Sequence, residues 1–231
     1  MKRNSGGIAE VAVESRRRVW SGGPIFLFFC FLLLSAACST NTEEDYFSKA
    51  DKFFDQGRFE KAAAVCKKYL VDFPEGKYRD KAMFRVAEVK YYALGEREAG
   101  IREFGFLINQ QPSSPFSYKA REVMAGFFRD ELKDYNRAIL EYKYLINRQP
   151  ENPRAAYYQF QEARCFILSG KLEQAITEFG ALISRYPDSE FVAPAYDELA
   201  GAYMALGRPE TAYKIFSRSE EHTSELQSPN T

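Results

Sequence analysis

The stretch that decides the fold is residues 163–187, ARCFILSGKLEQAITEFGALISRYP. From Ala175 to Leu182, small and apolar residues recur at spacings of four and three, which place them on one face of a helix. Gly170 can adopt the left-handed conformation that ends one helix, and Pro187 cannot continue the hydrogen-bond ladder of the next. The stretch therefore predicts two helices joined by a tight turn, a helical hairpin.

The same pattern recurs along the chain at a period of 37 or 38 residues. Turn residues stand at Gly57, Gly95, Lys133, Gly170 and Gly207; small residues follow at Ala62, Gly100, Ala138, Ala175 and Ala212; prolines close the units at Pro74, Pro112, Pro150 and Pro187. A single hairpin cannot bury its apolar faces alone, so the units must stack. The sequence predicts an all-α solenoid of about five hairpins, at about 43–76, 81–114, 119–152, 156–189 and a truncated 193–217.

This layout resembles the tetratricopeptide repeat. The fourth unit carries the resemblance on Ala163, Gly170, Leu172, Ala175, Phe179 and Pro187, and the fifth on Tyr196, Leu199, Ala200, Tyr203, Gly207, Ala212 and Phe216. The chain departs from the pattern at Lys133, where glycine is usual, and at Gly100, where alanine is usual. The resemblance implies a right-handed solenoid that binds other proteins in a groove lined by the first helix of each unit.

Residues 1–37 read as an export signal. Basic residues, among them Arg16, precede the apolar run from Ile25 to Leu34, which is too short for a membrane-spanning helix of roughly 20 residues. The sequence Leu34-Ser35-Ala36-Ala37-Cys38 resembles a bacterial lipobox. In that family the chain is cut before the cysteine, which then carries fatty acyl chains such as palmitate. Cleavage by the ordinary signal peptidase, giving a free secreted protein, is the alternative. The residue after the cysteine is Ser39. An aspartate at this position commonly retains lipoproteins in the inner membrane, so its absence favours sorting to the outer membrane.

The combination of lipobox and repeats resembles the BamD-type lipoproteins of outer-membrane protein assembly. The resemblance covers nearly all of residues 38–217. The linker Tyr186-Pro187-Asp188-Ser189 resembles both these lipoproteins and the periplasmic coordinator of the Tol-Pal system. It implies a lipid-anchored protein on the periplasmic face of the outer membrane that holds a barrel-forming partner. A coordinator of the Tol-Pal or cell-division type, or a pilus or secretin assembly lipoprotein, stays open. An envelope enzyme or its regulator is the remote alternative.

Residues 218–231 begin RSEEHTSELQS, which matches one translated frame of a common sequencing adapter. We expect this tail to be non-native and exclude it from the fold prediction. It contains His222, the only histidine of the chain.

Composition and motifs argue against catalysis. With 32 basic and 32 acidic residues the chain has no net charge, unlike a typical nucleic-acid binder. Without native histidine or a glycine-rich phosphate loop, we expect no enzyme activity, metal, cofactor or small-molecule substrate. Acidic neighbours such as Asp130 and Glu131 point about 100° apart on a helix, so we expect a solvated face rather than a shared site. Cys66 and Cys165 lie three units apart and should be buried, unbridged thiols.

Aromatic and arginine side chains on the first helix of each unit form the candidate partner-binding groove. Such residues are favoured in binding hot spots, although packing on a neighbouring helix is an equally reasonable role for any one of them. The candidates are Phe47, Phe54, Arg85, Tyr92, Phe127, Tyr157, Phe160 and Arg164.

Overall fold

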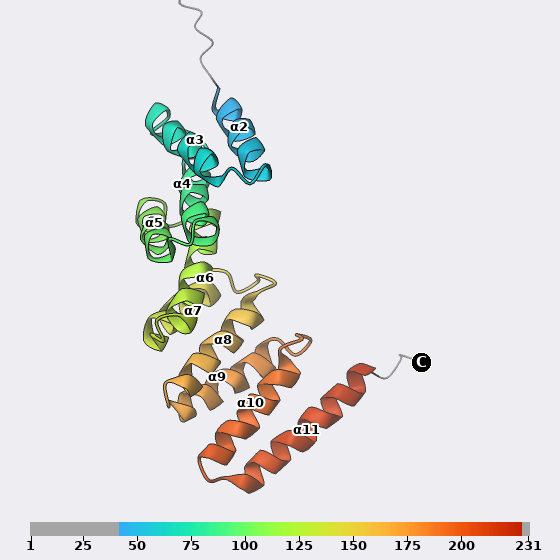
Figure 1. Ribbon diagram of the computed structural model, residues 1–231. Helices are drawn as coiled ribbons and strands as arrows, with labels where there is room; N and C mark the ends of the chain where they lie inside the picture. Colours follow the sequence, from blue (N-terminus) through green and yellow to red (C-terminus); the bar gives the residue numbers. More distant parts are fainter. Residues whose placement is uncertain (1–41, 228–231) are drawn as a thin grey trace, which may run out of the picture. The chain divides into compact units, whose positions relative to one another are not determined.

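The computed structural model describes residues 42–227, with side-chain surroundings as far as Ser219. The chain divides into two units, Met1–Asn41 and Thr42–Thr231, and the described residues fall in the second. The predicted export signal and Cys38 lie outside the described residues. The helices, labelled in Figure 1, are α2 (Glu43–Asp55), α3 (Phe59–Asp72), α4 (Arg79–Glu88), the π-helix η1 (Val89–Ala93), α5 (Arg97–Gln110), α6 (Pro115–Asp130), α7 (Tyr135–Arg148), α8 (Ala155–Leu168), α9 (Leu172–Arg185), α10 (Val192–Ala205) and α11 (Pro209–Gln227).

These helices pair in sequence order into five hairpins, which we number 1 to 5: α2–α3, α4/η1–α5, α6–α7, α8–α9 and α10–α11. Each helix packs against the next one along the chain, and first helices also meet directly, as α4 meets α6 and α8 meets α10. Figure 1 shows the pairing most clearly for α10 and α11. Between residues 42 and 227 there is no strand, and no helix is both long and apolar enough to cross a bilayer. The predicted all-α fold of about five stacked hairpins is confirmed.

The turn inside each hairpin has a left-handed residue at the predicted position. Four of them are glycines, with φ between 68° and 73°: Gly57, Gly95, Gly170 and Gly207. Lys133 takes the same conformation with φ 54°, as its place in the period predicted. A lysine can occupy this position only at a cost, because its Cβ crowds the backbone in the left-handed region.

The second helix of each of the first four hairpins ends two residues before its proline. The residue between the helix end and the proline leaves helical geometry in every copy, with φ between −139° and −128° and ψ between 57° and 70°. These residues are Phe73, Gln111, Gln149 and Tyr186. Proline disfavours helical geometry in the residue before it. The prolines therefore end the helices at the same point in each copy and fix the period.

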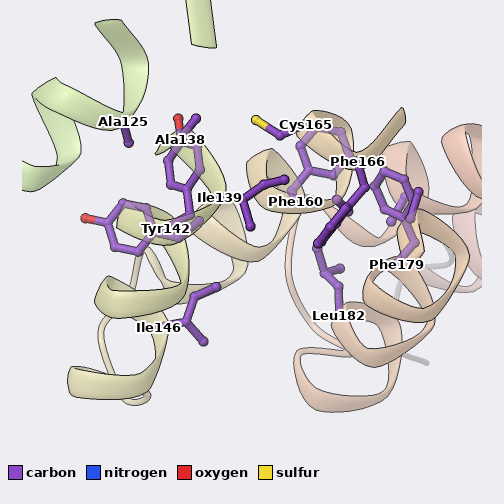
Figure 2. Packing of buried hydrophobic residues seen from close by; sticks show 14 of the residues in the cluster. Ala125, Ala138, Ile139, Tyr142, Ile146, Phe160, Cys165, Phe166, Phe179 and Leu182 are labelled. Carbon is purple, nitrogen blue, oxygen red and sulfur yellow. The ribbon is translucent and has the colours of Figure 1, made fainter. Parts of the chain in front are cut away.

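The core is a chain of contacts between neighbouring hairpins. Figure 2 shows part of its largest cluster, to which α6, α7, α8 and α9 contribute Ala125, Tyr142, Phe160 and Phe179. Fully buried alanines allow the helices to approach, and the aromatic rings fill the space between them. The stacking predicted from the repeat is therefore the source of the core.

The cysteines behave as the sequence predicted. Cys66 and Cys165 are both buried and both free. Burial raises the pKa of the Cys66 thiol to about 11 and that of Cys165 to about 12. Both thiols are therefore protonated at neutral pH, and burial also shields them from reagents in solvent.

Candidate partner-binding face

The first helices of consecutive hairpins are joined by charged side chains. At three of the four junctions an arginine on, or at the start of, one first helix pairs with a carboxylate of the neighbouring first helix: Arg85 with Asp51 at 3.2 Å, Arg154 with Glu122 at 2.5 Å, and Arg164 with Glu198 at 3.2 Å. The residues of these pairs keep between 23% and 53% of their side-chain surface exposed. Because exposed ion pairs contribute at most about 1 kcal/mol each, this row can be rearranged at small cost. We call the surface that carries it the first-helix face.

The structure brings two pairs of the predicted residues together on this face. The guanidinium of Arg85 lies 4.4 Å from the ring centre of Phe54, and that of Arg164 lies 6.0 Å from the ring centre of Phe160. Arg85 also pairs with Glu88 at 3.0 Å on its own helix. Ring and acid together hold Arg85 in place while about a quarter of its side chain remains accessible.

Three of the predicted aromatics belong to the core. Phe47, Phe127 and Phe160 are between 4% and 8% exposed. The Phe160 ring, for example, packs against Phe179 and Phe191 of the hairpin's second helix and the next linker. A first helix contacts its own second helix and the neighbouring hairpins as well, so the side chains on these sides of it are buried. These three rings are therefore part of the core beneath the first-helix face.

Two of the remaining predicted aromatics, Tyr92 and Tyr157, meet in one hollow together with Phe127. It is a cavity of about 210 Å³ between η1, α6 and α8. Tyr92 is 64% exposed at its rim, and Phe127 forms part of its floor. The remaining lining residues are Tyr91, Glu122, Val123, Gly126, Asp130, Glu131 and Tyr142.

Asp130 and Glu131 keep 58% and 38% of their side-chain surface exposed, as expected of a solvated face. Glu131 follows α6 with helical backbone angles, and its amide donates to the Phe127 carbonyl, so the two side chains diverge as on a helix. Both residues nevertheless border the hollow. Each carboxylate has an arginine partner outside the lining: Asp130 receives two bonds of 2.6 Å from Arg129, and Glu131 pairs with Arg97.

Arg129 links hairpins 3 and 4 beneath the face. Besides Asp130, it donates to the Tyr142 hydroxyl at 3.0 Å and to the side-chain oxygen of Gln161. The Arg129 guanidinium holds the pKa of the Asp130 carboxyl below its usual range. Asp130 is therefore ionised at physiological pH, and its charge is balanced by Arg129.

From the sequence, the carboxylates that pair with arginines on the first-helix face were not identified. Asp51, Glu88, Glu122 and Glu198 carry its ion pairs, and none was a candidate. One signal was available, because the paired residues lie 34, 32 and 34 positions apart, just under one period. Among the described residues there is no group of three or more histidines, cysteines and acids that could hold a metal ion.

Comparison with known proteins agrees with the fold. The tetratricopeptide repeat family profile matches residues 157–189, which span most of hairpin 4. No curated protein matches the chain in sequence.

Solved structures similar to the chain include MamA 41-end from Desulfovibrio magneticus RS-1, at 14% identity and a TM-score of 0.58, with 80% of this chain and 97% of that one covered. Another MamA crystal structure has 20% identity and a TM-score of 0.58, with coverages of 82% and 97%. A putative kinesin light chain from Podosopora anserina with nearly identical TPR-like repeats has 14% identity and a TM-score of 0.57, with coverages of 80% and 97%. At these identities the likeness concerns the fold. The chain is an all-α solenoid of tetratricopeptide-like hairpins.

Proposed function

We propose that this chain is a non-enzymatic scaffold of the bacterial envelope that binds other proteins on its first-helix face. The observation that carries the proposal is the row of pairs Asp51–Arg85, Glu122–Arg154 and Arg164–Glu198, which runs beside an aromatic hollow. Preformed helices present this row without an ordering cost to the scaffold. Each weak pair can exchange one partner for a charged group of a bound protein.

The proposed cellular setting is the periplasmic face of the outer membrane, with acylated Cys38 as the anchor. The lipobox-like residues before Cys38 support it. Several acyl chains give firm anchoring, because each buried CH₂ contributes about 0.8 kcal/mol. Helix α2 begins five residues after Cys38, so a tether of at most about 20 Å would separate the first hairpin from the lipid.

Within that setting, the role in outer-membrane protein assembly is our favoured proposal, with a barrel-forming protein as the partner. Its support is the sequence resemblance to BamD-type lipoproteins. A Tol-Pal or cell-division coordinator and a pilus or secretin assembly lipoprotein would use the same face for different partners, and the partner experiment separates them.

The anchor is tested with a Cys38→Ala variant. We expect the parent chain to incorporate radiolabelled palmitate and to fractionate with the outer membrane, and the variant to do neither. A parent chain that is released in soluble form without label would overturn the anchoring proposal and leave the binding proposal intact.

The binding face is tested by purifying the tagged full chain from native membranes and identifying the co-purifying proteins. We expect a barrel-forming protein to be recovered, and the Arg85→Glu and Arg164→Glu double variant to lose it. Arg102→Glu is the matched control, since Arg102 is exposed on α5, a second helix. Melting curves would show that each variant is folded. Retention of every partner by the folded double variant would refute the proposed face, and recovery of Tol, Pal or secretin proteins instead would move the role to those systems.

A further inference from the structure

Hairpins 2 and 3 each contain one extra residue near the end of the first helix. In hairpins 1, 4 and 5 a buried alanine lies seven residues before the left-handed turn residue, and in hairpins 2 and 3 it lies eight residues before it. The short pairs are Ala50 and Gly57, Ala163 and Gly170, and Ala200 and Gly207; the long pairs are Ala87 and Gly95, and Ala125 and Lys133.

The two hairpins take up the extra residue in related ways. In hairpin 2 it produces the π-helical turn Val89–Ala93, and the Glu96 amide donates to the carbonyl of Lys90, six residues back. In hairpin 3 the Asp134 amide likewise donates to the carbonyl of Phe128, six residues back. The corresponding bond in hairpin 4 spans five residues. π-Helical turns occur frequently at functional sites because they displace side chains from the helical register.

The displaced backbone of η1 requires a glycine on the facing helix. A Cβ added at Gly100 would lie 2.6 Å from the Tyr91 Cβ and 2.9 Å from its Cα. The other four hairpins have alanine at this position. The departure at Gly100 and the π-helical turn are therefore one feature, which fixes the position of Tyr91.

Both extra residues border the same hollow. Its walls include Tyr91 and Tyr92 from η1, and Asp130 and Glu131 from the end of α6. Tyr157 of α8 closes another side. The junction between α4 and α6, which this hollow borders, is the one where no ion pair joins neighbouring first helices among the described residues.

The lining is suited to a cation. Aromatic faces attract a positive group, and Glu122, Asp130 and Glu131 add carboxylates, while none of the described lining residues carries a positive charge. Each of these carboxylates already pairs with an arginine outside the lining, Glu122 with Arg154, Asp130 with Arg129 and Glu131 with Arg97. A carboxylate has about four acceptor sites, so each can accept a further hydrogen bond from an entering cation. The pKa of the Tyr92 hydroxyl is raised, first by burial and then by the Glu88 and Glu122 carboxylates, so both acids act on the rim of the hollow.

The size of the hollow restricts the occupant further. About 210 Å³ is less than the roughly 300 Å³ at which pockets for whole small-molecule ligands begin. The long side chain of a protein residue is a better match in size. We propose that the hollow between η1, α6 and α8 receives the side chain of a lysine or arginine from an extended segment of a partner protein. This inference rests on the proposed function, because it assumes that the first-helix face binds protein.

Gly126 provides a variant that fills the hollow without disturbing the fold. It lines the hollow from the middle of α6, and a Cβ added there would meet no atom within 4 Å. Gly126→Leu should also gain up to about 1 kcal/mol of helix propensity. Gly180→Leu is the matched control, because Gly180 lies mid-helix in α9 with the same open surroundings and is not part of the hollow.

The probe is a display library of random dodecapeptides, selected on the immobilised full chain in mild detergent. We expect the selected peptides to share a lysine or arginine. Fluorescence anisotropy should show that its replacement by norleucine, which removes the charge and keeps the stem, weakens binding about tenfold. Gly126→Leu should weaken binding by a similar factor and Gly180→Leu should not. In the Gly126→Leu background the norleucine exchange should have no further effect.

The outcomes separate this inference from the proposed function. Peptides that lose binding in the Arg85→Glu and Arg164→Glu double variant, but tolerate both norleucine and Gly126→Leu, would overturn the cation hollow and leave the binding face standing. A selection that yields no peptide dependent on the first-helix face would overturn both.

Discussion

The Nζ atom of Lys143 lies 3.5 Å from the Oε1 atom of Glu162, a carboxyl group whose residue is only 1% exposed. That distance is too long for a strong hydrogen bond, and this oxygen has no other partner. Burial, helped by the nearby Glu178 carboxylate, raises the pKa of Glu162 from 4.5 to about 7, against the opposing charges of Lys143 and Arg185. Glu162 therefore loses its proton more readily in the unfolded chain than in the folded one.

The first prediction is that stability falls as pH rises through this window. Because the folded pKa is the higher one, the contribution of Glu162 is fully present below pH 4.5 and is lost as pH rises to about 7. The full loss is about 3 kcal/mol. Glu162→Gln cannot ionise, so its free energy of unfolding in urea should vary less over this range. Glu173→Gln, at an exposed position of α9, should retain the parent's pH dependence. Identical pH profiles for parent and Glu162→Gln would contradict the assignment.

The second prediction concerns the left-handed turn of hairpin 3. Lys133→Gly should stabilise the chain by a few tenths of a kcal/mol to about 1 kcal/mol, because relief of Cβ crowding exceeds the added freedom of the unfolded chain. Gly170→Ala, at φ 73°, should destabilise it through the reverse effect. Urea midpoints measure both changes. A lower midpoint for Lys133→Gly would show that the lysine side chain makes a compensating contact.

The third prediction tests the close approach of η1 and α5. Gly100→Ala should destabilise the chain by about 1 to 3 kcal/mol, since its Cβ would meet Tyr91 main-chain and Cβ atoms at under 3.0 Å. Gly105→Ala on the same helix meets nothing within 4 Å and should stabilise by up to about 1 kcal/mol. Equal shifts in the unfolding midpoints of the two variants would mean that the packing of the π-helical turn is not tight.

The fourth prediction concerns the start of the repeat domain. The Tyr69 hydroxyl, in a fully buried residue, donates to Glu43 at 2.6 Å and accepts the Tyr78 amide at 3.0 Å. It thereby joins the start of α2 to the linker after α3. Tyr69→Phe should cost about 1 to 3 kcal/mol because the Tyr78 amide loses its partner.

Hydrogen exchange should locate this loss in hairpin 1. Relative to the parent chain, Tyr69→Phe should speed the exchange of the Tyr78 amide more than the exchange of amides in hairpin 4. Tyr213→Phe, at a residue 74% exposed, is the control for loss of a hydroxyl alone. Unchanged protection at Tyr78 in Tyr69→Phe would show that the linker is held by other contacts.

The hairpins could be predicted because glycine and proline act locally. Gly57 and Pro74 determine backbone conformation at their own positions, so their period marks helix ends before any packing is known. Even Lys133 followed from its register. The π-helical turn could not be predicted in this way. The extra residue before Gly95 is visible as spacing, but no residue type specifies whether a helix absorbs it as a π-turn or as a longer loop.

The candidate face was predictable only in part for a different reason. Phe54 and Arg85 were found because aromatic and arginine residues are conspicuous. Exposure depends on how neighbouring hairpins pack, and Phe127 is buried because it lies between hairpins. Pairs such as Glu122 and Arg154 form between two hairpins, so they depend on how far successive first helices are shifted along each other. The sequence of one repeat does not specify this shift.

The extra residue in hairpins 2 and 3 has an evolutionary consequence. In an array of near-identical units, one added codon in each of two adjacent copies is enough to make one junction unlike the others, and no catalytic or binding motif needs to arise. Insertion of a whole repeat between these copies would separate Tyr92 from Glu131, while a duplication elsewhere would leave the junction unchanged. Among homologous chains, the eight-residue spacing should therefore be inherited by both hairpins together or by neither.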